Sequence, residues 1–299
     1  MHKKTMTYLL LLTCLLCASV LPSQAQLSPF AHVGGVGLIS THVPVQREHP
    51  LAWGLVSMWR AIPGLDGGRQ WYDLMSTHHG TLTNGAAWGA TVRSGGFGEI
   101  RCDGVTTYVD VGLTSDFYAS TQTTLTAAIW LKPNADALTA AQLRLFSFQR
   151  STGSLGWALQ TSGTGGFLEG RYRNVSNSNT LLTGTTALDT GWHHGAFVLN
   201  GTVATLYLDG KQEGAATDMD STNTFIAGAN LATLGSFDGS SNTWNGALDD
   251  ARLYLRALTA LEVAALYSLG RQGDTGLLNR GPLINVGGSQ TAGFFQFMQ

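Results

Sequence analysis

The stretch that decides the fold is HHGAFVLNGTVATLYLDGKQE, residues 193–213. Within it, apolar and polar side chains alternate along residues 204–208, which is the period of a strand with one face in a core. The dipeptides Asn200-Gly201 and Asp209-Gly210 each separate two such segments, and both predict tight hairpin turns with positive φ. Three consecutive antiparallel strands are therefore expected here.

Similar apolar segments recur between residues 51 and 270, separated by Gly, Asn, Asp and Ser. About a dozen of them, with turns between, predict an all-β protein of the sandwich or jelly-roll type. The predicted strands are 55–59, 87–92, 98–102, 107–111, 125–132, 143–148, 156–160, 168–173, 193–199, 204–208, 231–237 and 248–254.

The sequence predicts one helix, close to the C-terminal end of this region. Thr259-Ala260-Leu261-Glu262 is a capping box, in which the Thr hydroxyl and the Glu carboxylate satisfy backbone N–H groups of the first turn. Gly270 is the expected stop signal after the last turn. We expect a short helix that docks on the edge of the sandwich.

Composition excludes several classes of protein. Charged residues make up 12% of the 299, with 38 Gly and a formal net charge of -2. Sparse charge with many turn residues favours a β protein over a disordered acidic chain. Since no long basic run occurs, we expect no nucleic-acid partner.

The two ends of the chain differ from the middle. Residues 1–25 have the basic start, apolar run and small-x-small end of a signal peptide, so we expect a secreted or cell-surface protein with no membrane span after cleavage. An uncleaved anchor and a lipoprotein are the alternatives. Residues 26–50 are predicted to be a linker and residues 271–299 a Gly-rich tail. Cleavage leaves one cysteine, Cys102, which we expect to be a small buried residue.

Several segments, in chain order, resemble the laminin-G-like jelly rolls of the concanavalin A-like lectin/glucanase superfamily. Together they extend over residues 51–270, and their shared order makes the resemblance specific. The segments are GLVSMW (54–59), YDLMSTHHGTL (72–82), IRCDG (100–104), TYVDV (107–111), LTAAIWLKP (125–133), GWHH (191–194), LYLDGK (206–211), GALDDARLY (246–254) and RALT (256–259). The resemblance implies a two-sheet antiparallel jelly-roll sandwich.

The resemblance also implies a structural Ca²⁺ ion at Asp249, with Asp73 and Asp250 as further ligands. Hard cations of this kind take six to eight oxygen ligands, mostly carboxylates and carbonyls. Asp249 and Asp250 lie in an apolar strand, where carboxylates are costly unless they are paired or bound to a metal. For one of the two, a salt bridge to Arg252 or Arg256 is the alternative.

No residue is predicted to be catalytic. A glucanase needs two carboxylates at suitable spacing, in the pattern Glu-x-Asp-x-Glu, and none of the five Glu has an acidic neighbour two residues away. Adjacent strand residues face opposite ways, so His193 and His194 cannot chelate one ion together. The resemblance implies that this pair is structural.

Sugars bind by stacking on aromatic rings beside polar groups. We place ligand contacts at Trp244, Trp157, Asn242 and Tyr172, where tryptophans near loops or strand ends stand beside polar residues. An exposed Trp244 would be a sugar platform, and a Trp packed at the sheet edge is the alternative. The function expected is a secreted module that binds a glycan or glycoprotein surface. A structural subunit of a surface or virion is the first alternative, and a glycoside hydrolase is the second.

Overall fold

The protein is represented by a computed structural model, which describes residues 45–62, 68–75, 78–89, 98–118, 121–140, 142–151, 154–173, 179–218, 225–226 and 230–271. The predicted signal peptide at 1–25, most of the predicted linker at 26–50 and nearly all of the predicted tail lie outside the described residues. Arg271 belongs to a helix and not to the tail.

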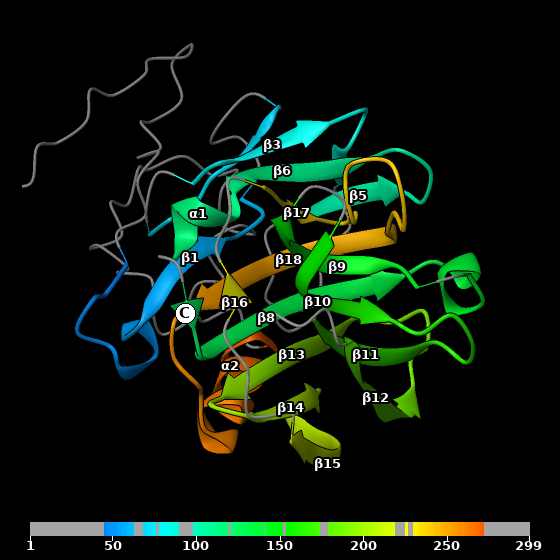
Figure 1. Ribbon diagram of the computed structural model, residues 1–299. Coiled ribbons are helices and arrows are strands. Elements are labelled where there is room, and N and C mark those ends of the chain that lie inside the picture. Colours follow the sequence, from blue (N-terminus) through cyan, green and yellow to red (C-terminus); the bar gives the residue numbers. More distant parts are fainter. Residues whose placement is uncertain are drawn as a thin grey trace, which may run out of the picture. The chain divides into compact units, whose positions relative to one another are not determined.

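Two antiparallel sheets make up the fold, as predicted (Figure 1). The first sheet runs in the order β15-β14-β13-β8-β18-β5-β4, and β1 also pairs with β18. Its strands are β1 (Leu55–Trp59), β4 (Ala87–Gly89), β5 (Glu99–Asp103), β8 (Thr124–Pro133), β13 (His193–Asn200), β14 (Val203–Leu208), β15 (Lys211–Asp218) and β18 (Asn245–Tyr254).

The second sheet runs in the order β12-β11-β10-β9-β17-β6-β3-β2. Its strands are β2 (Gln70–Trp71), β3 (Gly80–Thr83), β6 (Tyr108–Leu113), β9 (Arg144–Ser151), β10 (Ser154–Thr161), β11 (Phe167–Arg173), β12 (Asn179–Ala187) and β17 (Leu231–Leu234). A separate ribbon pairs β7 (Thr121–Gln122) with β16 (Phe225–Ile226). Strands β2, β3, β7, β12 and β16 were not predicted.

Between the two sheets lies a core rich in aromatic rings. Trp157 of β10 stacks on Phe148 of β9, with ring centroids 4.5 Å apart, and on Phe197 of β13, at 6.4 Å. Because Phe197 belongs to the first sheet and the other two to the second, this stack joins the sheets. Cys102 is buried as predicted, and burial raises the pKa of its thiol to about 12, which disfavours the thiolate form.

The turns follow the sequence closely. Asp209 and Gly210 link β14 to β15 with φ of 49° and 76°, the positive values predicted for both positions. The turn from β13 to β14 is one residue later than predicted, because Asn200 still pairs with Val203. Gly201 carries the positive φ there, at 61°.

The predicted helix is α2 (Ala260–Arg271), and Figure 1 shows it beside β13 and β14. Val263 and Leu266 bury its apolar side against the outer face of the first sheet. Gly270 is not the stop signal that the sequence predicted, since it lies inside the helix. There a Cβ atom would stand 2.6 Å from Nε1 of Trp130, so glycine permits the close approach. Three shorter helical turns were not predicted, namely α1 (Thr114–Phe117), η1 (Pro50–Ala52) and η2 (Ala135–Leu138).

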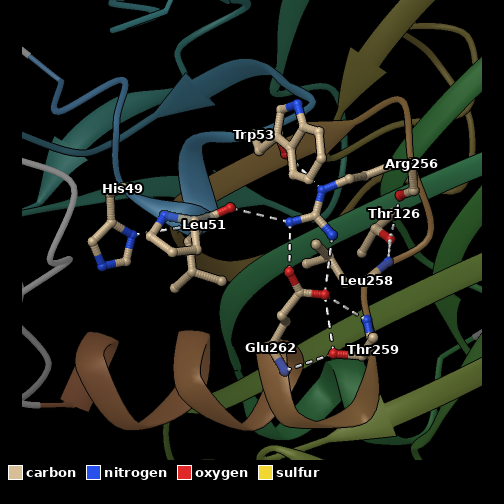
Figure 2. Close-up of polar contacts among 9 residues, drawn as sticks. His49, Leu51, Trp53, Thr126, Arg256, Leu258, Thr259 and Glu262 are labelled. Carbon is tan, nitrogen blue, oxygen red and sulfur yellow. Dashed lines mark hydrogen bonds and ion pairs between the residues drawn. The ribbon is translucent and has the colours of Figure 1, made fainter.

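Arg256 fixes the start of α2 to the rest of the domain (Figure 2). Its guanidinium donates to the carboxylate of Glu262 at 2.7 and 3.0 Å and to the backbone carbonyls of Trp53 and Pro50 at 2.6 and 3.3 Å. Glu262 also accepts from the N–H of Thr259 at 2.8 Å, which confirms the capping box. Because of these contacts, the pKa of Glu262 falls to about 2.

Candidate ligand-binding site

Two of the three predicted calcium ligands bind backbone on opposite edges of one strand. Oδ1 of Asp73 accepts from the N–H groups of Met58 and Met75, both at 2.9 Å. Oδ1 of Asp249 accepts from the N–H of Ala61 at 3.0 Å. β1 pairs with β18 on one edge and bridges to Asp73 on the other. Asp73 and Asp249 therefore do not converge on one ion.

Asp250, the third predicted ligand, is neutralised inside the protein. Its carboxylate accepts from Nε and Nη2 of Arg252 at 2.8 and 2.9 Å, which is the alternative that the sequence had left open. Asp250 has a φ of 46° at a β-bulge in β18. Among the described residues, no group of three or more His, Cys, Asp or Glu is suited to a metal ion. The arrangement of these three carboxylates therefore does not fit a shared calcium site.

The predicted aromatic contacts lie in the interior. Trp244, Trp157 and Tyr172 are fully buried, each at 0% exposure. Trp244 donates from Nε1 to the carbonyl of Ala247 at 3.4 Å, and its ring packs in the core. The expectation of an exposed Trp244 is therefore wrong. Trp157 and Tyr172 lie directly opposite each other on β10 and β11, on the face that these strands turn to the core.

Asn242, the fourth predicted contact, is half-buried and lies beside the first residue of β9. Its side-chain amide donates to the carbonyl of Gln142 at 2.7 Å. Its own carbonyl accepts from the N–H of Arg144 at 2.9 Å. The turn that carries Asn242 is thus attached to the first residue of β9.

Arg144 begins a row of polar side chains on the outer face of the second sheet, by which we mean the face turned away from the core. Cross-strand partners share a face, and the pairing aligns Arg144, Gln160, Glu169 and Thr183 across β9, β10, β11 and β12. The next row is Thr233, Ser147, Ala158, Arg171 and Leu181. The second row continues from Thr233 to Asp110 of β6, and on β9, β10, β11 and β12 Glu169 is the single carboxylate.

Hydrogen bonds hold part of the first row in place. The carboxylate of Glu169 accepts from Gln160 at 2.8 Å and from Thr183 at 3.2 Å. Gln160 is fully buried and Glu169 is 4% exposed. This row is therefore a built polar surface and not a set of solvated side chains.

Two groups in this row have hydrogen-bonding capacity left over. Nε and Nη1 of Arg144 and Oε1 of Gln160 are shielded from solvent and have no hydrogen-bond partner among the described residues. Burial, assisted by the charge of Arg171 and opposed by Glu169, lowers the pKa of Arg144 to about 9. The guanidinium thus lies where its charge is poorly compensated.

The rim of this surface is formed by half-buried side chains. Arg171 donates to the side chain of Gln142 at 3.0 Å. Phe237 places its ring 5.5 Å from the guanidinium carbon of Arg144, and its backbone carbonyl accepts from Ser147 and Gln149, both at 3.1 Å. Asn242 completes the rim beside Gln142. We call Arg144, Gln160, Glu169, Arg171, Phe237 and Asn242 the β9–β11 site.

Sequence reasoning missed most of this site. The signal that was available is the alternation along β11, where Glu169, Arg171 and Arg173 share one face. It also missed Trp53, an exposed aromatic at 79% that lies over Arg256 in Figure 2. Both histidines of the pair contact other side chains: His193 contacts Asp209 and Asp189, whereas His194 lies 5.3 Å from the ring of Trp130.

Residues 103–264, more than half of the chain, match the family model described as the concanavalin A-like lectin/glucanases superfamily. The chain belongs to this superfamily. The β9–β11 site lies wholly within the matched part of this concanavalin A-like chain. A comparison with curated proteins gave no match.

Solved structures with the same fold include carbohydrate-binding domains. Domain 4 of the extracellular arabinanase AbnA of Geobacillus stearothermophilus, solved with arabinotriose, is 17% identical over 71% of this chain and 98% of its own, with a TM-score of 0.51. The botulinum neurotoxin serotype D ligand-binding domain, solved in complex with N-acetylneuraminic acid, is 11% identical over 72% of this chain and 50% of its own, with a TM-score of 0.54.

The sialidase of Trypanosoma rangeli is 14% identical over 75% of this concanavalin A-like chain and 34% of its own, with a TM-score of 0.54. The chain thus spans about a third of the sialidase. At such identities the likeness shows the fold alone. Within the described part of this chain, no helix is long and apolar enough to cross a bilayer.

Proposed function

We propose that this protein is a non-catalytic carbohydrate-binding module whose site is the β9–β11 site. The observation that carries the proposal is the row of buried polar side chains on the outer face of the second sheet, with an aromatic ring at its rim. Carbohydrate sites combine polar groups, fixed in place, with an aromatic side chain for the apolar face of a sugar ring. Phe237 supplies the ring, and Arg144, Gln160 and Asn242 supply the polar groups.

A binding role is favoured over hydrolysis because glycosidases canonically use a pair of carboxylates. Glu169 is the single carboxylate on β9, β10, β11 and β12, and it is already hydrogen-bonded to Gln160 and Thr183. Binding domains with the same fold, solved with arabinotriose and with N-acetylneuraminic acid, support the same choice.

We further propose that the chain is exported after removal of residues 1–25, so that its glycan is extracellular. The basic start and apolar run of that segment support this. The N-terminal residue of the protein recovered from a secreting host, determined by mass spectrometry, tests it. A mature chain that starts at Gln26 is expected, and a full-length chain retained in the membrane would contradict export.

The binding proposal is tested with the mature chain on a glycan array, followed by calorimetry on the hits. Phe237→Ala and Asn242→Gly are expected to weaken binding at least tenfold, because they remove the stacking ring and a rim amide. Glycine suits position 242, where φ is 51°. The matched control is Trp53→Ala, which removes the most exposed tryptophan outside the site. If Trp53→Ala lost binding and Phe237→Ala kept it, the sugar would bind near Trp53 and not at the β9–β11 site. An array on which no glycan binds would reject the proposed function.

A further inference from the structure

Two donor atoms of the buried Arg144 have no acceptor among the residues that the structure describes. The residue is 3% exposed, and neither Nε nor Nη1 has a partner among the described residues. A buried guanidinium normally binds a carboxylate or carbonyl oxygens, because a buried charge without such partners is strongly destabilising. Arg252 shows the ordinary solution in this same protein, since it forms a two-point ion pair with Asp250.

The charges around Arg144 leave the β9–β11 site positive. Arg171 and Arg173 lie on the same face of β11. The charge of Arg171 contributes to lowering the pKa of Arg144, and the charge of Arg173 contributes to lowering the pKa of Arg171. Glu169 is the only carboxylate on β9, β10, β11 and β12, and its oxygens accept from Gln160 and Thr183. Along β9, β10 and β11, this face therefore carries three arginines and one carboxylate.

Beside the unmatched donor lies an unmatched acceptor. Gln160 pairs with Arg144 across β10 and β9, and its Oε1 is shielded from solvent without a donor among the described residues. A carboxylate would satisfy Arg144, and a hydroxyl group would satisfy Gln160. A sugar acid carries both groups a few bonds apart.

We propose that the β9–β11 site recognises acidic sugars, with Arg144 as the residue that binds the carboxylate and Gln160 as an acceptor for a neighbouring hydroxyl. The inference rests on the proposed carbohydrate-binding function. Phe237, whose ring centroid lies 5.5 Å from the guanidinium carbon of Arg144, and Arg171, whose charge acts on that guanidinium, are the half-buried side chains beside it. Arg–carboxylate pairs of this kind are strong and directional.

The test compares ligands that differ by one carboxylate. Isothermal titration is carried out on the mature chain with sialyllactose against lactose and with methyl glucuronide against methyl glucoside. We expect an acidic member to bind at least tenfold more tightly than its neutral counterpart, and Arg144→Met to abolish that preference. The matched control, Lys211→Met, removes a positive charge from an exposed position on β15 and is expected to retain the preference.

A second variant covers the case in which Arg144→Met does not fold. Glu169→Gln removes the competing negative charge and keeps the hydrogen-bonding shape, so it is expected to strengthen binding of the acidic ligand several-fold. Equal affinity for acidic and neutral sugars, unchanged in Glu169→Gln, would overturn the inference and leave the binding function standing. No binding of any array sugar would overturn both.

Discussion

Asp250 and Arg252 form a two-point ion pair across the bulge of β18, with side chains only 2% and 3% exposed. The pair accounts for one of two adjacent aspartates in an otherwise apolar strand. Breaking a buried pair leaves an uncompensated charge, which costs more than the intact pair contributes. We expect Asp250→Asn to lower the free energy of unfolding by about 3 to 5 kcal/mol, as measured by urea denaturation.

The double variant Asp250→Asn with Arg252→Met is the control for this prediction. It removes both charges, so its loss of stability is expected to be smaller than that of Asp250→Asn alone. If the double variant lost as much stability as Asp250→Asn alone, or more, the unpaired charge of Arg252 would not be the reason for the effect.

A second prediction concerns calcium. Asp249 accepts from two backbone N–H groups, of Ala61 and Asp250, so its role in the fold needs no ion. We expect Asp249→Ala to lower the melting temperature by the same amount in Ca²⁺ and in EGTA, and Ca²⁺ to leave the wild type unchanged. A melting temperature that Ca²⁺ raises in the wild type but not in Asp249→Ala would instead confirm the calcium ion that the family resemblance implies.

The third prediction is a pH dependence that arises from His193. Burial would lower its pKa, but the hydrogen bonds and charges of Asp209 and Asp189 outweigh burial and raise it above 6.5. A raised pKa means that the protonated form stabilises the folded state, fully below the unfolded value and progressively less as the pH rises through the folded value. Stability should therefore decline as the pH rises above about 6.5.

His193→Gln tests the source of this decline. The urea midpoint of the variant is expected to vary less with pH in that range than the midpoint of the wild type. A variant with the same pH profile as the wild type would assign the dependence to other groups.

The fourth prediction concerns the start of α2. Thr259→Ala removes the hydroxyl that caps the N–H of Glu262 at 3.3 Å, at an expected cost of about 1 kcal/mol. Thr259→Ser keeps the hydroxyl and is expected to stay within about 0.5 kcal/mol of the wild type. Thermal unfolding followed by circular dichroism compares the two, and an equal loss in both would point to the methyl group and not to the cap.

Much of the fold could be predicted from local sequence. β1 was predicted to the residue, and β14 to within one residue, because apolar and polar side chains alternate there and turns bound both strands. β12 (Asn179–Ala187) was missed because most of its side chains are polar or small and it forms the edge of its sheet. A strand of this kind is defined by its pairing with β11, which local sequence does not show.

The site was harder to predict, because burial depends on which face of a strand meets the core. Trp157 and Tyr172 occupy the core face of β10 and β11, so the aromatics expected to bind sugar stabilise the sandwich instead. Arg144 and Gln160 had no motif around them and are brought together only by strand pairing. Asn242 was chosen for its polar turn, and it does lie at the rim.

The burial of the tryptophans has a spectroscopic consequence. Trp59, Trp71, Trp157 and Trp244 are at 0% exposure, whereas Trp53 is at 79%. A collisional quencher such as iodide would therefore extinguish the emission of Trp53 first in the native protein. Trp53→Phe would leave a fluorescence signal dominated by the interior, with the half-buried Trp88 and Trp192 as the tryptophans still partly open to solvent.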